Sequence, residues 1–231
     1  MSYFRRTFQG MSSDSSLQLL SKLSPAQTVY ILRPNSLLRD LLKYTLMDLI
    51  LQEKLQLLNY DPTPVQGASR LGYAFVIAGK KFTGEKPQLH EMVFLFPFYR
   101  KKSARLVMKH LMQMGLNAAR SESNFKQHLL MDLPEMKPLF AKRWWQKIFG
   151  GQNLTEHGKT VQANLIKQLN VLDKELPDLM KTDHEKASVI LQKIKGNVLL
   201  MNSFKFDLIQ RISEELFFLE EELEEGKQGN S

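Results

Sequence analysis

The chain of 231 residues contains no cysteine, so it can form neither a disulfide bond nor a cysteine-ligated metal site. No apolar run approaches the roughly 20 residues of a membrane-spanning helix. The longest, residues 92–98, is interrupted by Pro97. Arg5 and Arg6 are followed by no apolar stretch, which is not typical of a secretory signal. These absences predict a soluble protein of a reducing compartment, and we expect it in the cytoplasm.

Motifs that support common kinds of catalysis are also missing. The sequence has no G-x-S-x-G nucleophile elbow, and its glycines match neither the P-loop nor the dinucleotide-binding pattern. The five histidines are scattered, and none forms an H-E-x-x-H metal motif. His90-Glu91, beside a Phe-rich segment, is the one histidine pairing that remains a candidate for a functional role. We therefore expect a non-enzymatic protein with no cofactor and no metal site.

Positive charge is concentrated in the first part of the chain. The net charge is +8, yet residues 1–150 hold 22 Lys and Arg against 10 Asp and Glu, whereas residues 151–231 hold 10 against 14. Such a basic region predicts weak, salt-sensitive affinity for nucleic acid from electrostatics alone. The acidic C-terminal region would oppose that affinity, either through its field or by folding over the basic face.

Hydrophobic spacing predicts a mainly helical chain, and 43% hydrophobic residues suffice for a packed core. Residues 1–23 are polar and Ser-rich, and we expect a mobile segment there, with a short helix at its end. Ser24-Pro25 is typical of a helix start, and the apolar residues of the segment 37–50 recur at helical spacing. Residues 54–58 suit a short strand, 59–70 a loop and 71–78 a stronger strand.

In this order of elements, residues 24–86 resemble the winged-helix superfamily. The resemblance rests on Ser24-Pro25-Ala26-Gln27, on the segment 41–50 followed by 54–58, and on the strand from Tyr73 to Ile77. It implies three helices and a β-wing, with Lys80 and Lys81 at the wing tip, where DNA-binding relatives carry basic residues. Glu53-Lys54 departs from the pattern, because many relatives have a glycine between helix and strand. The segment Leu154-Thr155-Glu156-His157-Gly158 suggests a second, degenerate winged helix over residues 88–158.

The remainder is predicted to be helical. Residues 89–96 fit both helical and alternating spacing, and we interpret them as a helix. Further helices are expected over residues 100–115, 123–133 and 138–149, and apolar stripes over 161–172 and 208–223, with Pro177 interrupting the chain between the stripes. The expected units are thus residues 24–86, 87–158 and 159–225, with a disordered tail over 226–231. The stripe 208–223 must pack on the 156–172 helix or on a second copy of the chain, and we favour packing within the chain.

A helix over residues 100–115 would place Lys101, Lys102, Arg105 and Lys109 within an arc of about 100°. That stripe is typical either of a phosphate-contacting surface or of a solvated face. The helix 37–52 is heavily apolar and offers two aspartates among its few polar residues, so we expect no sequence-selective reading of bases.

The segment 142–149 is basic and aromatic, which makes Trp144 and Trp145 candidate membrane contacts. Phe140, Trp144 and Ile148 are also spaced as on a core-facing helix. Three functions stay open: a scaffold that binds a protein partner or a second copy through the C-terminal helices, a nucleic-acid-binding transcriptional regulator, and a peripheral membrane protein. We rank them in that order, with a membrane surface as the least favoured partner.

Overall fold

The computed structural model describes residues 14–59, 74–84, 86–141 and 153–228. It is mainly helical, with 70% helix and one small antiparallel sheet of order β1-β2-β3, so the expectation of a mainly helical chain with a small sheet is confirmed. The α-helices are α1 (Asp14–Lys22), α2 (Pro25–Leu32), α3 (Leu38–Leu51), α4 (Met92–Arg100), α5 (Met108–Ala119), α6 (Glu122–Asp132), α8 (Glu156–Thr182), α9 (His184–Ile194) and α10 (Asp207–Gln228). The 3₁₀ helices are η2 (Pro134–Leu139) and η3 (Lys195–Leu200), and the strands are β1 (Leu55–Leu58), β2 (Phe75–Ala78) and β3 (Leu106–Val107).

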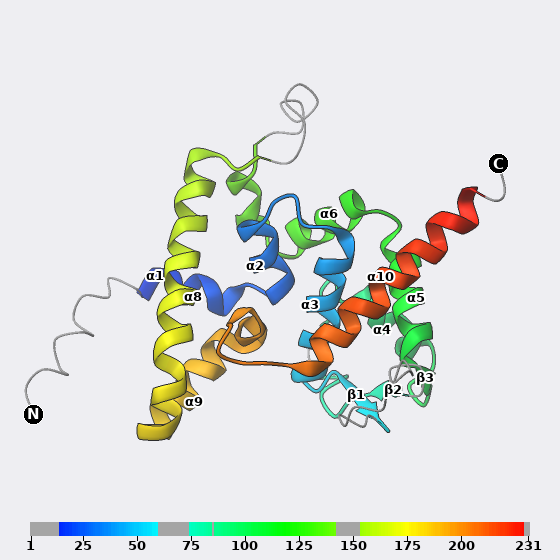
Figure 1. Ribbon diagram of the computed structural model, residues 1–231, viewed down its shortest axis with the longest axis horizontal. Helices are drawn as coiled ribbons and strands as arrows, with labels where there is room; N and C mark the ends of the chain where they lie inside the picture. The colour runs from blue at the N-terminus through cyan, green and yellow to red at the C-terminus, as the bar shows by residue number, and fades with distance from the viewer. Residues whose placement is uncertain (1–13, 60–73, 85, 142–152, 229–231) are drawn as a thin grey trace, which may run out of the picture.

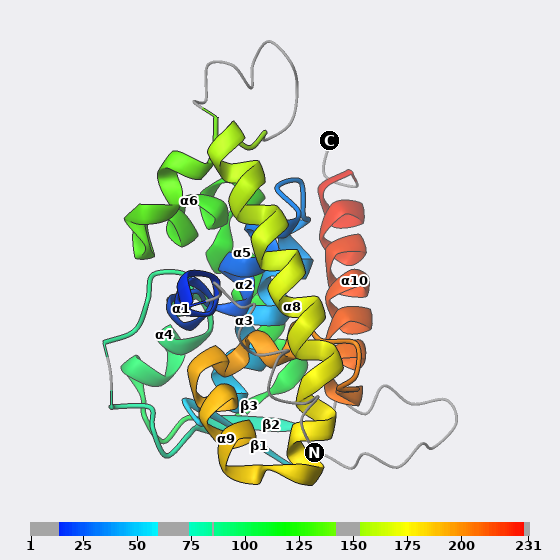
Figure 2. The ribbon, with the colours of Figure 1, turned by 90° about the vertical axis from the view of Figure 1, so that its left-hand side faces the viewer.

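The helices α2 and α3 lie between two long helices. Figure 1 shows α8 on one side of this pair and α10 on the other, and the sheet lies at one end beside α4 and α5. In Figure 2, viewed from the α8 side, α10 lies to the right of α8. One hydrophobic core continues through the regions 24–86, 87–158 and 159–225. In the described part of the chain, no helix is both long enough and apolar enough to cross a membrane.

Helix α2 begins as its sequence predicts. The Ser24 hydroxyl accepts a hydrogen bond from the Gln27 backbone N–H, and the Gln27 side chain accepts one from the Ser24 N–H, forming a capping box. The Gln27 amide also donates to the carbonyl of Leu129 on α6, at 3.0 Å. The cap therefore fixes both the start of α2 and its position against α6.

The chain from α3 to β2 forms the expected helix followed by a strand pair. Leu55 to Leu58 pair with Ala78 to Phe75 in antiparallel register. Between the two strands, residues 60–73 lie outside the described part of the chain. Lys80 and Lys81 lie in the turn that follows β2, as expected, and Lys81 contacts Glu53 just before β1. Gly79 allows this close approach, since a Cβ there would come within 2.1 Å of the Glu53 carbonyl oxygen.

The prediction of one helix over residues 100–115 is wrong. Residues 89–96 were rightly interpreted as helical, but α4 runs on to Arg100, and Leu106 and Val107 then pair with β2 before α5 begins. Gly115 lies inside α5 rather than at a helix end. A Cβ at this position would meet the Phe94 ring at 2.3 Å, so the glycine allows close packing of α5 on α4. Lys101, Lys102 and Arg105 therefore lie in a loop, and no helical stripe exists.

Two further predictions, a helix over residues 138–149 and a helix break at Pro177, are also wrong. The helix over residues 138–149 does not begin as predicted, because Phe140 forms a β-bridge with Leu154; residues 142–152 lie outside the described part. Pro177 does not interrupt its helix, because α8 continues through it. Proline lacks the N–H that would bond to the carbonyl of Asp173. The Ser203 hydroxyl supplies that hydrogen bond instead, at 2.7 Å.

The ends of the chain differ from expectation in part. Of residues 1–23, residues 1–13 lie outside the described part, while 14–22 form α1, and Leu20 and Leu23 are buried in the core. Residues 226–228 belong to α10, and 229–231 are not described. The segment 14–23 is therefore a packed part of the fold rather than a mobile start.

Helix α10 packs within the chain, as favoured from the sequence, but on different elements. It lies across α3 and α5 rather than on the 156–172 part of α8. Its apolar stripe supplies Ile212, Leu216 and Leu219, all fully buried. The apolar stripe is thus used inside one copy of the chain.

Candidate functional site

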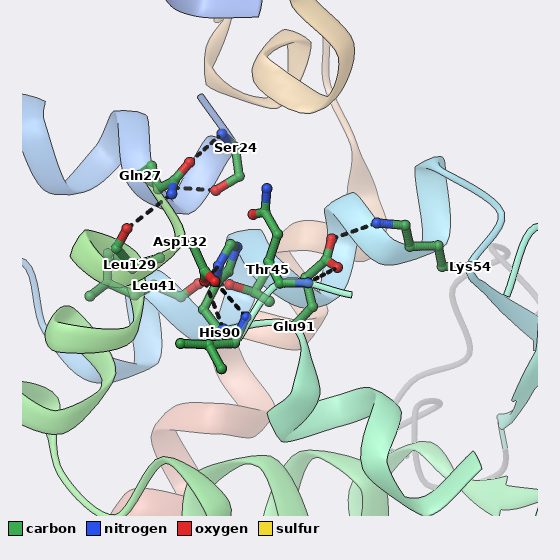
Figure 3. Close-up of polar contacts among 11 residues, drawn as sticks. Ser24, Gln27, Leu41, Thr45, Lys54, His90, Glu91, Leu129 and Asp132 are labelled. Atoms are coloured by element: carbon green, nitrogen blue, oxygen red, sulfur yellow. Dashed lines mark hydrogen bonds and ion pairs between the residues drawn. The ribbon is translucent and has the colours of Figure 1, made fainter. Parts of the chain in front are cut away.

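The pairing His90-Glu91 lies in a buried polar cluster between α3, α4 and α6. His90 contacts Asp132, with 2.6 Å between Nδ1 and Oδ2, and Glu91 contacts Lys54, with 2.7 Å between Oε1 and Nζ. Figure 3 shows the two pairs pointing in different directions from adjacent positions in the chain. All four side chains are largely buried, and a buried charge is tolerated only when it is paired.

The Lys54–Glu91 pair joins the end of α3 to the start of α4. The second carboxylate oxygen of Glu91 accepts a hydrogen bond from the Gln88 backbone N–H at 2.9 Å. Both oxygens of Glu91 are thereby used. The pair is a structural tie, and it leaves no surplus charge at this point of the cluster.

Asp132, at the end of α6, holds the loop before α4. Its carboxylate accepts hydrogen bonds from the backbone N–H groups of Leu89 and His90 and from the His90 ring. Burial raises the pKa of Asp132, but the hydrogen bonds from His90 and Leu89 outweigh burial and hold the pKa below its ordinary value. The His90 ring is only 1% exposed and packs edge-on against Phe125. This histidine therefore offers no face to a dissolved substrate, and we assign it a structural role.

Asp48, on α3, is the exception in this cluster. It is 4% exposed, and its Oδ1 has no hydrogen-bond partner among the described residues. Burial raises the pKa of Asp48 to about 6, against the opposing effect of a hydrogen bond from the Gln52 side chain. At neutral pH the protein therefore buries a carboxylate that is mostly ionised and incompletely satisfied.

A small cavity of about 70 Å³ lies at Asp48. Its wall combines Asp48, Gln52, Lys54, Gln88, Glu91 and Gly196, with the turn between α1 and α2 and Lys195. The Oε1 of Gln88 also lacks a hydrogen-bond partner within the described ranges. The cavity thus has a polar wall, while the two unpartnered oxygens are themselves buried against protein atoms.

The loops of the predicted basic residues lie at the same end of the sheet, although not on a helix. The register of β2 with β3 carries residues 101–105 toward the end of β2, where the turn 79–84 begins. The rings of Phe82 and Tyr99 confirm this proximity, with centroids 4.7 Å apart. Lys80, Lys81, Lys101, Lys102 and Arg105 come from these two loops. Arg105 lies over the Phe75 ring, and Lys81 contacts Glu53 at 3.2 Å.

Lys109 is used differently from the other five basic residues. It lies on α5 and contacts Glu215 and Glu222 of α10, at 3.7 and 3.3 Å. Arg39 on α3 likewise contacts Glu220 at 3.0 Å. The acidic helix therefore neutralises residues of α3 and α5, and it leaves the two basic loops at the end of the sheet outside these pairs.

A groove of about 410 Å³ lies beside the C-terminal half of α10. Its apolar lining includes Leu37, which is 43% exposed, and Leu38, Leu116 and Leu223. Charged residues of both signs complete it: Arg39, Arg120, Glu122 and Glu220. A surface that combines apolar and charged side chains is common in protein-binding sites.

The remaining candidates add nothing to these sites. Trp144 and Trp145 lie outside the described residues. Within the described ranges, no group of three or more His, Asp or Glu is placed to hold a metal ion. The chain matches no known family model, and no curated protein or solved structure is significantly similar to it.

Sequence reasoning found part of the polar cluster and missed the rest. His90-Glu91 stood out beside its aromatic neighbours, whereas Asp48 was counted with the polar residues of an amphipathic helix. One signal was available: Asp48 stands seven residues after Leu41, so the two side chains share one side of α3, and Leu41 is fully buried. The partners Gln88 and Gly196 carry no local signal at all.

Proposed function

We propose that this protein is a non-catalytic scaffold of the winged-helix type that binds another protein in the groove beside α10. The observation that carries the proposal is Leu37, a large apolar side chain 43% exposed at a groove that the described chain leaves open. The leucines of the groove would contribute to affinity because binding removes their apolar surface from water. The charged residues beside them would orient the partner. The order α2, α3, β1, β2 supports the winged-helix assignment, although the described part of residues 24–86 holds two helices where three were expected.

The groove predicts the chemistry of its partner. A short segment with apolar side chains fits the leucines, and an acidic residue on it would meet Arg120, which is exposed at the rim. Arg39 and Glu122 already contact Glu220 and Lys126. We therefore expect an apolar segment with net negative charge rather than a basic one.

Two groove variants test this role, Leu37→Glu and Arg120→Glu. Both should abolish capture of a stoichiometric partner cross-linked in native cells, while Val189→Glu, at an equally exposed apolar site on α9, should retain it. Far-ultraviolet circular dichroism should show that all three variants fold. A set of partners unchanged by both groove variants would rule out this surface.

Nucleic-acid binding is the second candidate, because the structure brings two basic loops to one end of the sheet. Helix α3 is covered by α10, so its face is used for packing rather than for entering a groove of DNA. We expect weak, sequence-independent binding. Fluorescence anisotropy with labelled DNA and RNA should show affinity falling with salt, with a slope near −0.9 per phosphate contact.

Charge-matched variants separate a real surface from net charge. Replacing Lys80, Lys81, Lys101 and Lys102 by alanine should weaken binding more than replacing Lys167, Lys174, Lys181 and Lys193, which lie on α8 and α9. Equal losses in the two variants would assign any binding to net charge alone.

A further inference from the structure

Helix α4 ends in two exposed aromatic rings. Phe96 is 48% exposed and Tyr99 is 44% exposed. The two residues are three positions apart on one helix, so their side chains are neighbours on its surface. The Tyr99 ring lies against the ring of Phe82, which is itself buried, with 4.7 Å between the centroids. The core therefore supports one side of Tyr99, while the rest of the ring is open to solvent.

Two arginines beside these rings are held against aromatic side chains. The Arg100 guanidinium lies over the Phe96 ring, 4.9 Å from its centroid, and the Arg105 guanidinium lies over the Phe75 ring at 4.1 Å. Both arginines are exposed, and neither contacts a carboxylate among the described residues. Packing on a ring restricts each side chain in advance, so less conformational freedom is lost when its guanidinium binds an anion.

Lysines extend the positive charge on both sides of the rings. Lys101 and Lys102 follow α4 directly, and both are exposed. Lys80 is exposed in the turn after β2, and the ring contact between this turn and α4 brings the two loops together. Lys81, in the same turn, is partly neutralised by Glu53 at 3.2 Å. The surface thus combines exposed aromatic rings with arginines and lysines that the described carboxylates leave without an ion pair.

From these features we propose that the end of α4 and its two adjoining loops bind a single strand of RNA or DNA. Bases stack on Tyr99 and on the exposed Arg100–Phe96 pair, and phosphates accept hydrogen bonds from Arg105 and the lysines. A duplex keeps its bases stacked on one another, so it can use the positive charges but not the rings. The proposal rests on the nucleic-acid candidate function and is independent of the groove beside α10.

An anionic membrane is the alternative ligand for a basic surface with exposed rings. The position of Arg100 over Phe96 argues against it, because burying this ring among acyl chains would carry the guanidinium out of water as well. Stacking with a base has no such cost, since the planar guanidinium is itself a stacking surface for bases. The observations therefore favour a nucleic acid.

Fluorescence anisotropy of the full chain with labelled oligo(dT) and oligo(rU) of about 15 nucleotides tests the proposal. The duplex of the same oligo(dT) with oligo(dA) is measured at the same salt concentration. Charge alone favours the duplex, because its phosphates are more densely spaced. Stacking reverses this order, and both single strands should bind at least about fivefold more tightly than the duplex. Tighter binding of oligo(rU) than of oligo(dT), or the reverse, assigns the preferred strand to RNA or to DNA.

Matched variants assign the preference to the rings. Phe96→Leu and Tyr99→Leu keep an apolar side chain but remove the aromatic face, so each should weaken single-strand binding at least about fivefold. Unchanged duplex binding and Tm show that these variants fold. Phe218→Leu, at a ring 57% exposed on α10, is the control and should bind as the parent does. Arg105→Gln should lower the salt slope by about 0.7, the value of one single-strand phosphate contact, whereas Lys167→Gln on α8 should not.

A single-strand preference that both ring variants lose and Phe218→Leu retains supports the proposal. Equal binding of single strand and duplex, unaffected by the ring variants, would overturn the stacking and leave the nucleic-acid candidate in place. Absence of binding to all three probes at low salt would overturn both. Binding to phosphatidylserine vesicles that the ring variants abolish, while their single-strand affinity is unchanged, would reassign the surface to a membrane.

Discussion

The interior charges and the charges along α10 are handled in opposite ways. Inside, Lys54–Glu91 and His90–Asp132 are short, buried pairs whose oxygens take additional backbone hydrogen bonds. Along α10, Arg39–Glu220 and Lys109–Glu222 are partly exposed, and the buried contacts are made by leucine and isoleucine. We therefore expect a charge pair to contribute strongly to the free energy of unfolding only where losing one partner leaves the other buried alone.

The largest effect is expected from breaking an interior pair. Lys54→Met leaves the Glu91 carboxylate buried without its cation and should cost about 3–5 kcal/mol in free energy of unfolding, measured by urea titration. The double variant Lys54→Met/Glu91→Leu should be more stable than the single one, because no charge is left behind. Lys81→Met, which breaks the exposed pair with Glu53, serves as control and should cost at most about 1 kcal/mol.

The next effect tests what holds α10 in place. Leu216 is fully buried against α3 and α5, so Leu216→Ala should cost about 2–5 kcal/mol through lost burial and the cavity left behind. The readout is the free energy of unfolding, with sedimentation velocity to follow the oligomeric state. An unchanged stability would mean that α10 does not depend on its apolar stripe.

Asp48→Asn should stabilise the protein at pH 8. Because the pKa is raised from 3.8 to about 6, the folded state holds a proton more tightly than the unfolded state, and ionising Asp48 costs stability as pH rises through this window. The shift corresponds to a destabilisation of the parent protein by about 3 kcal/mol, which is present above pH 6 and absent below about pH 4. Urea titrations of both proteins at pH 8 and pH 4 would measure it; a variant advantage independent of pH would contradict the assignment to this carboxyl.

The smallest effect is expected at the surface of α10. Glu220→Ala removes the contact with Arg39 and should cost no more than about 1 kcal/mol. High salt should reduce this cost further, since both partners are reached by solvent. A cost similar to that of Leu216→Ala would show that the acidic residues, rather than the apolar stripe, hold the helix.

Parts of the candidate site could be anticipated because their signals are local. His90 and Glu91 are adjacent and lie beside aromatic residues, and their polar nature inside an apolar context was visible. The cavity could not be anticipated, because it is assembled from Asp48, Gln88 and Gly196, which are distant in the chain. The lysines and arginine of the two loops are visible in the sequence, but their proximity follows from the pairing of β2 with β3 and not from a helix.

Local sequence patterns are enough to predict the helical class, the capping of α2 by Ser24 and Gln27, and the apolar stripe of α10. These depend on spacing within a few residues, which one segment contains in full. Contacts between distant elements explain why Gly115 and Pro177 lie within helices and why α10 packs on α3 and α5. At Gly115 the reason is the Phe94 ring, and at Pro177 it is the Ser203 hydroxyl that replaces the missing donor. Both partners are supplied by other elements of the chain, where no local pattern can indicate them.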